Sequence, residues 1–419
     1  MKHRVAITGL GMVSPLGHTI EDNYNRLSAR ERGIARFGFN GHEALPHCTC
    51  GAITEFHPSS LIDNKRLFKL MNRESQLAWI AASRAITDSR IDDRYVKNRM
   101  GVYLGTGLTS GELDALAPIA EHSVDEEGEF SYRLLGTQAL AKCNPLLSFK
   151  ILPNMALSYI AIEHQAQGPN MVFTPWPGNA LQAIVEAARS IQSGEIDCAL
   201  AGGCDSKTNY VSFLTLERLG LLSRTGRGAT PLSPLADGLI PGEGAACLFL
   251  ESFEHAAQRN ARIYSEILGG ASASDCHSEK QFPSYAPVLE AAMRSACADA
   301  GVECSQIDCI CTSMNSHPQG DATELHAIRS VFEDDRMPAL AALSEYTGDL
   351  MAAAPAYQTA MCAYAFTQKS HFPFLSVPRG ADAHERSDDT HNGMRTALIN
   401  AFSIGTTKAS LVIGHFDGE

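Results

Sequence analysis

Short apolar runs alternate along the chain with stretches in which apolar residues recur every three or four positions. The first pattern is typical of buried strands and the second of amphipathic helices, so the sequence predicts a layered α/β protein. The predicted strands are Val5–Thr8, Val102–Gly105, Met171–Thr174, Cys198–Ala201, Ala245–Leu250, Ile307–Thr312 and Leu411–Gly414.

Helices are predicted where residues that favour helix ends flank a stretch of helical periodicity. A helix over Ala180–Ser193 is expected to have Asn179 as its N-cap. Pro287 opens a second helix, which ends at Gly301, and Asp321 with Glu324 forms the predicted cap of a third.

One supersecondary pattern occurs twice. A strand, a glycine turn and another strand span Cys198–Leu250, and the same order returns at Ala397–Gly414. The repeat suggests two similar halves, for which we predict residues 1–255 and 256–419, within one compact unit.

Composition narrows the class of protein. Of the 419 residues 44% are hydrophobic and 19% are charged, which is typical of a globular chain and not of a disordered one. The net charge of −13 argues against a nucleic-acid partner. The twelve cysteines show no disulfide-framework spacing, so we expect reduced thiols in a cytoplasmic protein. No apolar stretch is long enough to span a membrane.

Three local motifs have an ordinary structural interpretation that we favour. Gly9 and Gly11 resemble the start of a dinucleotide-binding fingerprint, but the third glycine is missing, so a tight strand-to-loop turn is expected. Two cysteine clusters lack the spacing of a zinc site, so no metal is predicted. They are His42, His47, Cys48 and Cys50, and the pair Cys309 and Cys311, which is expected to be buried.

The stretch from 168 to 179 is the most informative. A strand ends and a helix begins there within a few residues, and a cysteine at such an elbow would be a ready nucleophile. This chain has Pro175, Trp176 and Pro177 instead. A second candidate, a nucleophile–base pair of Ser313 and His317 at a strand end, fits a polar loop equally well.

Motifs along the whole chain carry a resemblance to a known family. They are the opening run from Val5 to Gly17, Met71-Asn72-Arg73, Ala201-Gly202-Gly203, Asp237-Gly238, Gly242-Glu243-Gly244-Ala245, Pro318 with Gly320-Asp321, and Asn400-Ala401-Phe402 with Gly405-Thr406. The chain resembles a β-ketoacyl-[acyl carrier protein] synthase of the elongating, thiolase-like type. The resemblance implies the layered αβαβα thiolase fold, built from two duplicated halves, and an obligate dimer.

The resemblance also implies which positions carry catalysis in active members, and this chain has lost all of them. The family's nucleophilic cysteine corresponds to Pro177 and its two histidines to Ser313 and Asp349. The family's lysine corresponds to Ser344. Proline has neither a thiol nor an N–H for an oxyanion, and a carboxylate would oppose a developing enolate. We therefore predict no catalytic residues.

A dead ketosynthase with an intact fold resembles a chain-length factor, the subunit that pairs with an active ketosynthase in type II polyketide, aryl-polyene or fatty-acid-like chain elongation. The implied function is non-catalytic: this subunit shapes the tunnel that holds the acyl chain at the dimer interface. The predicted tunnel residues are Leu108, Leu113 and Leu116, although ordinary core positions would also suit leucine.

The resemblance implies an active ketosynthase as heterodimer partner, an acyl carrier protein that is met only indirectly, and no cofactor. Two alternatives remain open at this stage. The chain could be a rewired enzyme, such as a malonyl-carrier-protein decarboxylase or a hydrolase using Ser313 or His317, or it could be a scaffold that forms a homodimer.

Overall fold

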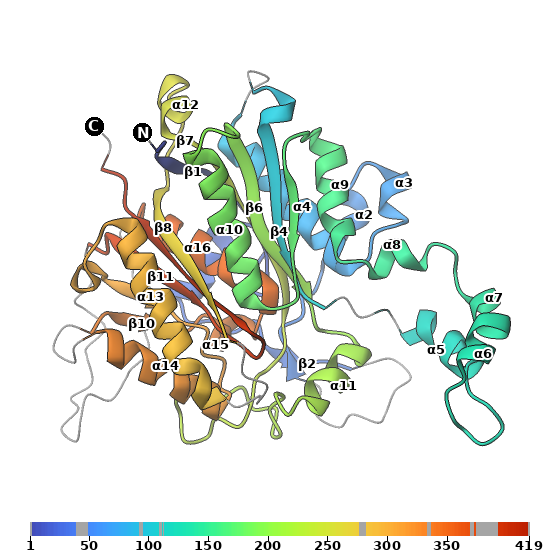
Figure 1. The fold of residues 1–419 in the computed structure, drawn as a ribbon. Coiled ribbons are helices and arrows are strands. Elements are labelled where there is room, and N and C mark those ends of the chain that lie inside the picture. The colour runs from blue at the N-terminus through green and yellow to red at the C-terminus, as the bar shows by residue number, and fades with distance from the viewer. Residues whose placement is uncertain are drawn as a thin grey trace.

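The computed structural model describes residues 2–38, 49–91, 95–108, 111, 113–275, 282–332, 337–368, 373 and 393–417. In that part of the chain one large sheet holds ten strands in the order β10-β9-β11-β12-β8-β1-β7-β6-β4-β5 (Figure 1). The N-terminal strands are β1 (Val5–Val13), β4 (Met100–Thr106), β5 (Asn170–Phe173), β6 (Cys198–Ser206) and β7 (Glu243–Ser252). The C-terminal ones are β8 (Ser265–Ser274), β9 (Cys309–Cys311), β10 (Ala339–Ala341), β11 (Thr396–Ala401) and β12 (Thr407–Gly414). A separate ribbon pairs β2 (Ala35–Arg36) with β3 (Thr49–Cys50).

The two groups of five strands have the same topology. In the first group β1 and β7 are antiparallel, as are β7 and β6, whereas β6, β4 and β5 are parallel. In the second group the sequence of pairings β8-β12-β11-β9-β10 repeats this pattern strand for strand. The groups meet where Val5–Ile7 pairs with Ser265–Ile267. The predicted duplication is thus present in the sheet, and the boundary at 255/256 stays a prediction.

Helices form three layers around the strands. The outer layer beside the first group holds α4 (Arg73–Ser89) and α9 (Asn154–His164), and the outer layer beside the second group holds α13 (Ala286–Ala300) and α14 (Pro318–Val331). Between the two groups of strands lie α10 (Pro177–Gln192) and α16 (Ala354–Ala365). Separate apolar clusters fill the space under α4, around the central helices, and under α13 and α14. The αβαβα architecture of the thiolase-like fold is therefore confirmed.

The remaining helices are short and lie mostly at the edges of these layers. They are α1 (Ile20–Ser28), α2 (Pro58–Leu61), α3 (Lys65–Phe68), α8 (Leu147–Ile151), α11 (Tyr210–Arg218), α12 (Phe253–Gln258) and α15 (Ser344–Thr347), with the 3-10 turns η1 (Lys97–Arg99), η3 (Phe282–Tyr285), η4 (Cys304–Gln306) and η6 (Met351–Ala353). No helix of the described chain combines the length and the apolarity needed to cross a bilayer.

A projecting arm interrupts this compact body. We use the word arm for residues 113–142, which form α5 (Leu113–Glu121), α6 (Tyr132–Leu134), the π-helical turn Leu135–Ala139 and α7 (Leu140–Lys142). These helices pack on one another and extend away from the body (Figure 1).

All of the predicted strands are present, but several local predictions were wrong. The predicted turn at Gly9 and Gly11 is absent because β1 continues to Val13. There the glycines let α4 approach: a Cβ at Gly9 would lie 2.2 Å from the Ala85 carbonyl oxygen and one at Gly11 would lie 2.1 Å from that of Ala81. Such distances leave no room for a side chain.

Two predicted helix caps were also wrong. The N-cap of α10 is Trp176 and not Asn179, because Pro177 supplies the first helical residue. The N-cap of α14 is His317 and not Asp321, because Pro318 again opens the helix. The helix that ends at Gly301 is confirmed.

Candidate functional site

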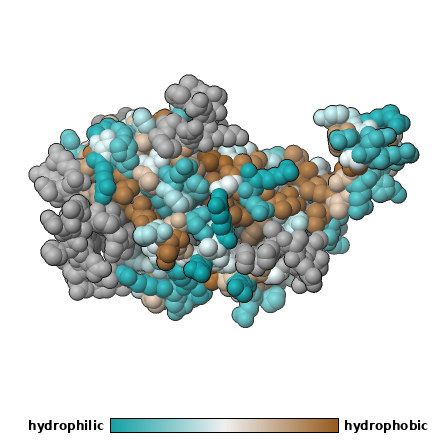
Figure 2. Space-filling view, turned by 90° about the horizontal axis from the view of Figure 1, so that it is seen from below, coloured by the Kyte–Doolittle hydropathy of each residue, from teal (hydrophilic) through white to brown (hydrophobic). Residues whose placement is uncertain are grey.

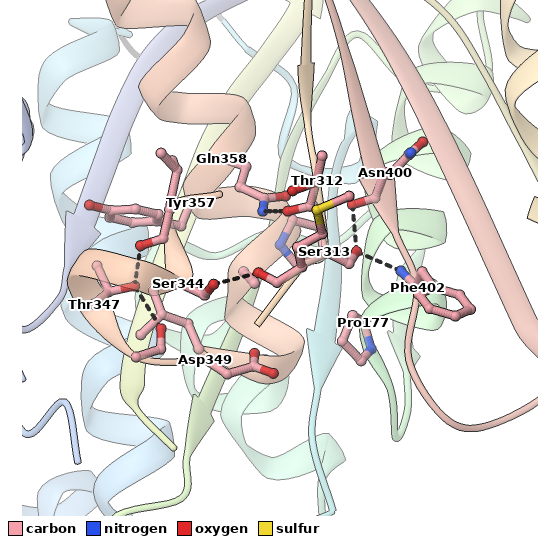
Figure 3. A pocket seen from close by; sticks show the side chains of 16 residues that line it. Pro177, Thr312, Ser313, Ser344, Thr347, Asp349, Tyr357, Gln358, Asn400 and Phe402 are labelled. Atoms are coloured by element: carbon pink, nitrogen blue, oxygen red, sulfur yellow. Dashed lines mark hydrogen bonds between the residues drawn. The ribbon is translucent and has the colours of Figure 1, made fainter. Parts of the chain in front are cut away.

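The four positions predicted to have lost their catalytic side chains lie around one pocket (Figure 3). This pocket sits at the N-terminus of α10 and beside η6, which leads into α16. Its cavity of about 20 Å³ is room for roughly one water molecule. It is lined by Pro177, Thr312, Ser313, Met314, Leu343, Ser344, Thr347, Gly348, Asp349, Leu350, Ala354, Pro355, Tyr357, Gln358, Asn400 and Phe402.

Pro177 is the first residue of α10 and is buried. Its ring occupies the position from which a nucleophile would face the helix N-terminus, and it has no backbone N–H to offer an oxyanion. Trp176 before it adopts an extended conformation, and its carbonyl oxygen accepts the Ala180 N–H at 3.1 Å. The elbow therefore begins a regular helix but presents no reactive group.

Ser313 holds two strand ends together. Its hydroxyl donates to the Asn400 carbonyl oxygen at 3.0 Å and accepts the Phe402 N–H at 2.7 Å. Its own N–H donates to Glu324 Oε1 at 3.1 Å. With its proton engaged by a backbone carbonyl and no imidazole beside it, this hydroxyl has a structural bridging role.

Ser344 and Asp349 also make backbone contacts. The Ser344 hydroxyl donates to the Met314 carbonyl oxygen at 2.5 Å. Asp349 Oδ1 accepts the Met351 N–H at 2.8 Å, so the carboxylate caps η6, and Oδ2 accepts from Asn315 Nδ2 at 2.7 Å. Both oxygens of the Asp349 carboxylate are therefore held by hydrogen bonds from neighbouring residues.

Acid groups dominate the electrostatics of the pocket and its wall. Burial raises the pKa of Asp349, and hydrogen bonds from Met351 and Asn315 partly offset this effect. Burial likewise raises the pKa of Asp321 to about 6 and that of Glu324 to about 8. The described residues that line the pocket include no thiol, imidazole or ammonium, the groups that the family resemblance assigns to attack on a thioester and to stabilisation of an enolate.

The proposed pairing of Ser313 with His317 is not formed in the structure. His317 caps α14, where its Nδ1 accepts the Gly320 N–H at 3.3 Å, and its ring lies against Phe282 at 4.7 Å between centroids. Burial lowers its pKa. Since the Ser313 hydroxyl is bonded to Asn400 and Phe402, the hydrolase interpretation loses its nucleophile–base pair.

The three leucines predicted to line a tunnel do not converge on one cavity in the described chain. Leu113 lines a groove of about 700 Å³ between the arm and the residues that follow β6. Leu108 is 52% exposed, and the side chain of Leu116 lies close to Gly111, which precedes the arm. The groove that Leu113 lines has a volume in the range of small-molecule sites.

None of the cysteines in the described part of the chain lines the pocket. Cys198, Cys309 and Cys311 are fully buried, as expected, and burial raises the pKa of the Cys198 thiol. The cysteines of the described chain are all free thiols. His42, His47 and Cys48 lie outside the described residues, and no group of three potential ligands within those residues could hold a metal.

Two buried lysines next to the site were not singled out from the sequence. Lys207 forms an ion pair of 2.6 Å with Asp205 and donates to the Leu108 carbonyl oxygen at 2.6 Å, which fixes the chain where it leaves β4 for the arm. Lys408 is fully buried in β12. The sequence signal for Lys408 is a single charged residue in an otherwise uncharged strand, where a buried lysine is rare unless its ammonium is hydrogen-bonded.

Comparisons with known proteins agree with one another. The family model described as Beta-ketoacyl synthase, N-terminal domain, matches residues 2–256, and that for the C-terminal domain matches residues 264–377. The chain is 27% identical to a 3-oxoacyl-[acyl-carrier-protein] synthase 2 of Coxiella burnetii over 98% of each protein. It is 28% identical to a mitochondrial 3-oxoacyl-[acyl-carrier-protein] synthase of Arabidopsis thaliana, over 98% of this chain and 92% of that protein.

Solved structures show the same fold. The ishigamide ketosynthase/chain length factor superimposes with a TM-score of 0.83 at 26% identity and covers all of both chains. A β-ketoacyl synthase from Burkholderia phymatum gives the same TM-score at 24% identity, again over the full length of both chains.

Proposed function

Because the chain belongs to the β-ketoacyl synthase family and its pocket holds none of the groups that condensation needs, we propose that it is a non-catalytic chain-length factor. In this proposal it pairs with an active ketosynthase and shapes the space for the growing acyl chain. The observation that carries the proposal is the pocket lined by Pro177, Ser313, Ser344 and Asp349, whose cavity has a volume of only about 20 Å³.

The pocket lacks the residues that the steps of a condensation require. Acyl transfer needs a nucleophile at the start of α10, where Pro177 stands. Decarboxylation of a malonyl thioester needs donors or a cation at the enolate oxygen, whereas Asp349 brings an acid. The decarboxylase alternative is disfavoured for the same reason.

An unpaired sheet edge supports the proposal of a partner. β5 ends the ten-stranded sheet and is hydrogen-bonded only to β4 within the described chain, so its other edge is open to another strand. Met171 on this strand is 47% exposed, and Ile162 on the adjacent α9 is 60% exposed. An open edge flanked by exposed apolar side chains is suited to pairing with a second subunit.

The arm adds a second apolar surface. Helix α5 contains Leu113, Leu116 and Ile119, yet none of its residues is buried in the single chain. Figure 2 shows apolar surface on the body beside the projecting arm. Helices of this composition are normally covered, so we propose that a ketosynthase protomer covers both the arm and the β5 edge.

The comparisons give this choice of partner some support. One structural neighbour is named as a ketosynthase/chain length factor, and its identity of 26% extends over the whole chain. In a pair of this kind the acyl carrier protein would deliver its chain to the active partner. The groove beside Leu113 is the part of this chain that we propose as a wall of the tunnel.

Co-expression tests the proposal. The chain is produced together with the ketosynthase encoded beside it, and size exclusion with native mass analysis gives the composition of the complex. We expect a one-to-one heterodimer that elongates a carrier-bound starter, and a chain that neither transfers acyl groups nor releases carbon dioxide when it is purified alone. A stable homodimer that ignores the ketosynthase would instead support the scaffold alternative, and carbon dioxide release by the lone chain would support the decarboxylase.

A further inference from the structure

Lys408 is a charged residue in a place where charge is costly. It lies in β12, is fully buried, and forms no ion pair with any described residue. Burial lowers its pKa to about 8, and the carboxylate of Asp275 at the end of β8 works against this shift. A buried ammonium persists only where specific acceptors hold it.

Those acceptors belong to one loop. The Lys408 ammonium donates to the Ser403 carbonyl oxygen at 2.9 Å and to the carbonyl oxygen of Gly405. It also lies 3.9 Å from the centre of the Tyr285 ring and 5.2 Å from that of Phe402. The lysine thereby ties residues 403–407 down onto the strand that follows them.

The opposite side of this loop rests on the elbow of α10. Gly405 has a φ of +104°, and a Cβ there would lie 2.5 Å from the Trp176 ring. A Cβ at Gly178 would lie 2.1 Å from the Thr407 carbonyl oxygen, so the loop and the start of α10 are in close contact. The loop is therefore held between Lys408 on one side and the elbow on the other.

The clamped loop borders the pocket described above. Phe402, the residue before the loop, and Pro177, the residue after Trp176, both line that pocket. Its cavity of about 20 Å³ compares with the several hundred Å³ that a site for a drug-sized ligand offers. The cavity is therefore too small for a thioester as it stands, and a movement of residues 403–407 would shift Phe402, which lines it.

We propose that Lys408 clamps the loop 403–407 shut and so excludes carrier-bound acyl thioesters from this chain's own pocket. Resting on the proposed function, this makes Lys408 a specificity-determining residue of the heterodimer. Pro177 already prevents loading of this chain, and the clamp in addition keeps a carrier-bound acyl group from occupying the unreactive pocket in place of the pocket of the active partner. The clamp itself is a property of this chain and is tested without the partner's activity.

A thiol introduced at the elbow reports whether the pocket opens. The full-length Pro177→Cys chain is treated with iodoacetamide, and alkylation at position 177 is followed by peptide mass analysis, which separates it from the native cysteines. Adding Lys408→Met keeps the apolar stem but removes the ammonium, so the fold is retained while the loop loses its anchor. We expect alkylation to become at least roughly tenfold faster. The hydrogen bonds from the Lys408 ammonium stabilise only the closed position of the loop, so their loss shifts the loop toward its open position.

Two controls and one independent readout accompany this test. Lys69→Met removes an exposed lysine and should leave the alkylation rate unchanged, whereas Lys408→Arg keeps the charge and should retain slow alkylation. In the Lys408→Met chain without the new cysteine, deuterium uptake by the peptide that covers 403–407 should also increase. Equal alkylation rates with and without Lys408, together with unchanged uptake, would overturn the clamp. If alkylation and deuterium uptake change as expected but the chain binds no ketosynthase, the proposed function is wrong and the clamp by Lys408 is still supported.

Discussion

Glu324 shows what happens to a carboxyl group that the fold encloses completely. Its Oε1 accepts from Ser313 N and Asn400 Nδ2, both at 3.1 Å, while Oε2 is buried with no hydrogen-bond partner. An unpaired carboxylate oxygen in such a place is costly, and this cost is what raises the pKa to about 8. At neutral pH the Glu324 carboxyl group is therefore mostly protonated. It supports Ser313 and Asn400, which line the pocket, as an uncharged acid.

The sign of the resulting pH dependence follows from linkage. The pKa of Glu324 is higher in the folded chain than its ordinary value of 4.5, so the folded state binds the proton more tightly. Its contribution to stability is fully present below about pH 4.5 and is lost as the pH rises through about 8. We expect the free energy of unfolding of the Glu324→Gln chain to fall less than that of the wild type as the pH rises from about 4.5 to about 8.

Chemical denaturation at several pH values checks this expectation in whichever assembly the wild-type chain adopts. Glu217→Gln, which neutralises an exposed carboxylate on α11, is the matched control and should follow the wild-type curve. A Glu324→Gln curve parallel to that of the wild type would show that Glu324 is not the group that titrates.

At the scale of elements, the open edge of β5 and the uncovered helix α5 are typical of a subunit that pairs with another chain and not of a monomeric protein. Both are apolar, and both belong to segments at the margin of the body. We expect Met171→Asp to weaken the heterodimer by roughly 30-fold, about 2 kcal/mol, because a carboxylate would be buried against the partner's strand.

Analytical ultracentrifugation of the co-purified pair measures this change. Leu235→Asp is the control, since Leu235 is also apolar and exposed, at 73%, but belongs to the segment between α11 and β7 and to neither β5 nor the arm. If Met171→Asp pairs as tightly as the wild type, the β5 edge is not the interface.

The elements also show where sequence reasoning succeeded and failed. Strands such as β6 and β7 were predictable because each contains a run of apolar residues, although β6 continues through Gly202 and Gly203 to Ser206, beyond its predicted end at Ala201. β8 was missed because Gly269, Gly270 and small residues replace the bulky side chains expected of a strand, and these let Ala300 of α13 approach to 2.3 Å from a Cβ at Gly269. The caps at Asn179 and Asp321 failed because a proline fixes the first turn earlier.

On the scale of the whole molecule, the candidate site was predictable only in part. The family resemblance picked out Pro177, Ser313, Ser344 and Asp349 from distant parts of the sequence, and the fold brings these side chains around one pocket. What each one does there depends on its contacts, such as the cap that Asp349 provides for η6, and no periodicity in the sequence records these. Lys408 was missed for the same reason.

The proposed tunnel wall beside Leu113 acts only when the chain is paired with a ketosynthase. In the reconstituted pair we expect Leu113→Trp to shorten the product by at least one extension unit, since the larger side chain would fill the groove it lines. Leu108→Trp and Leu116→Trp test the other two predicted positions, and Leu235→Trp serves as the control. Mass spectrometry of the released products gives the chain length, and unchanged products in all three variants would contradict the assignment.

The pairing of β1 with both β7 and β8 has a consequence for how the protein is made. β1 leaves the ribosome well before its two neighbours, which are formed by residues 243–274. The centre of the sheet therefore stays open until more than half of the chain has been synthesised, and the early strand waits with both edges unpaired. Translation speed and chaperone supply should consequently govern the yield of this chain more strongly than the stability of its finished fold does.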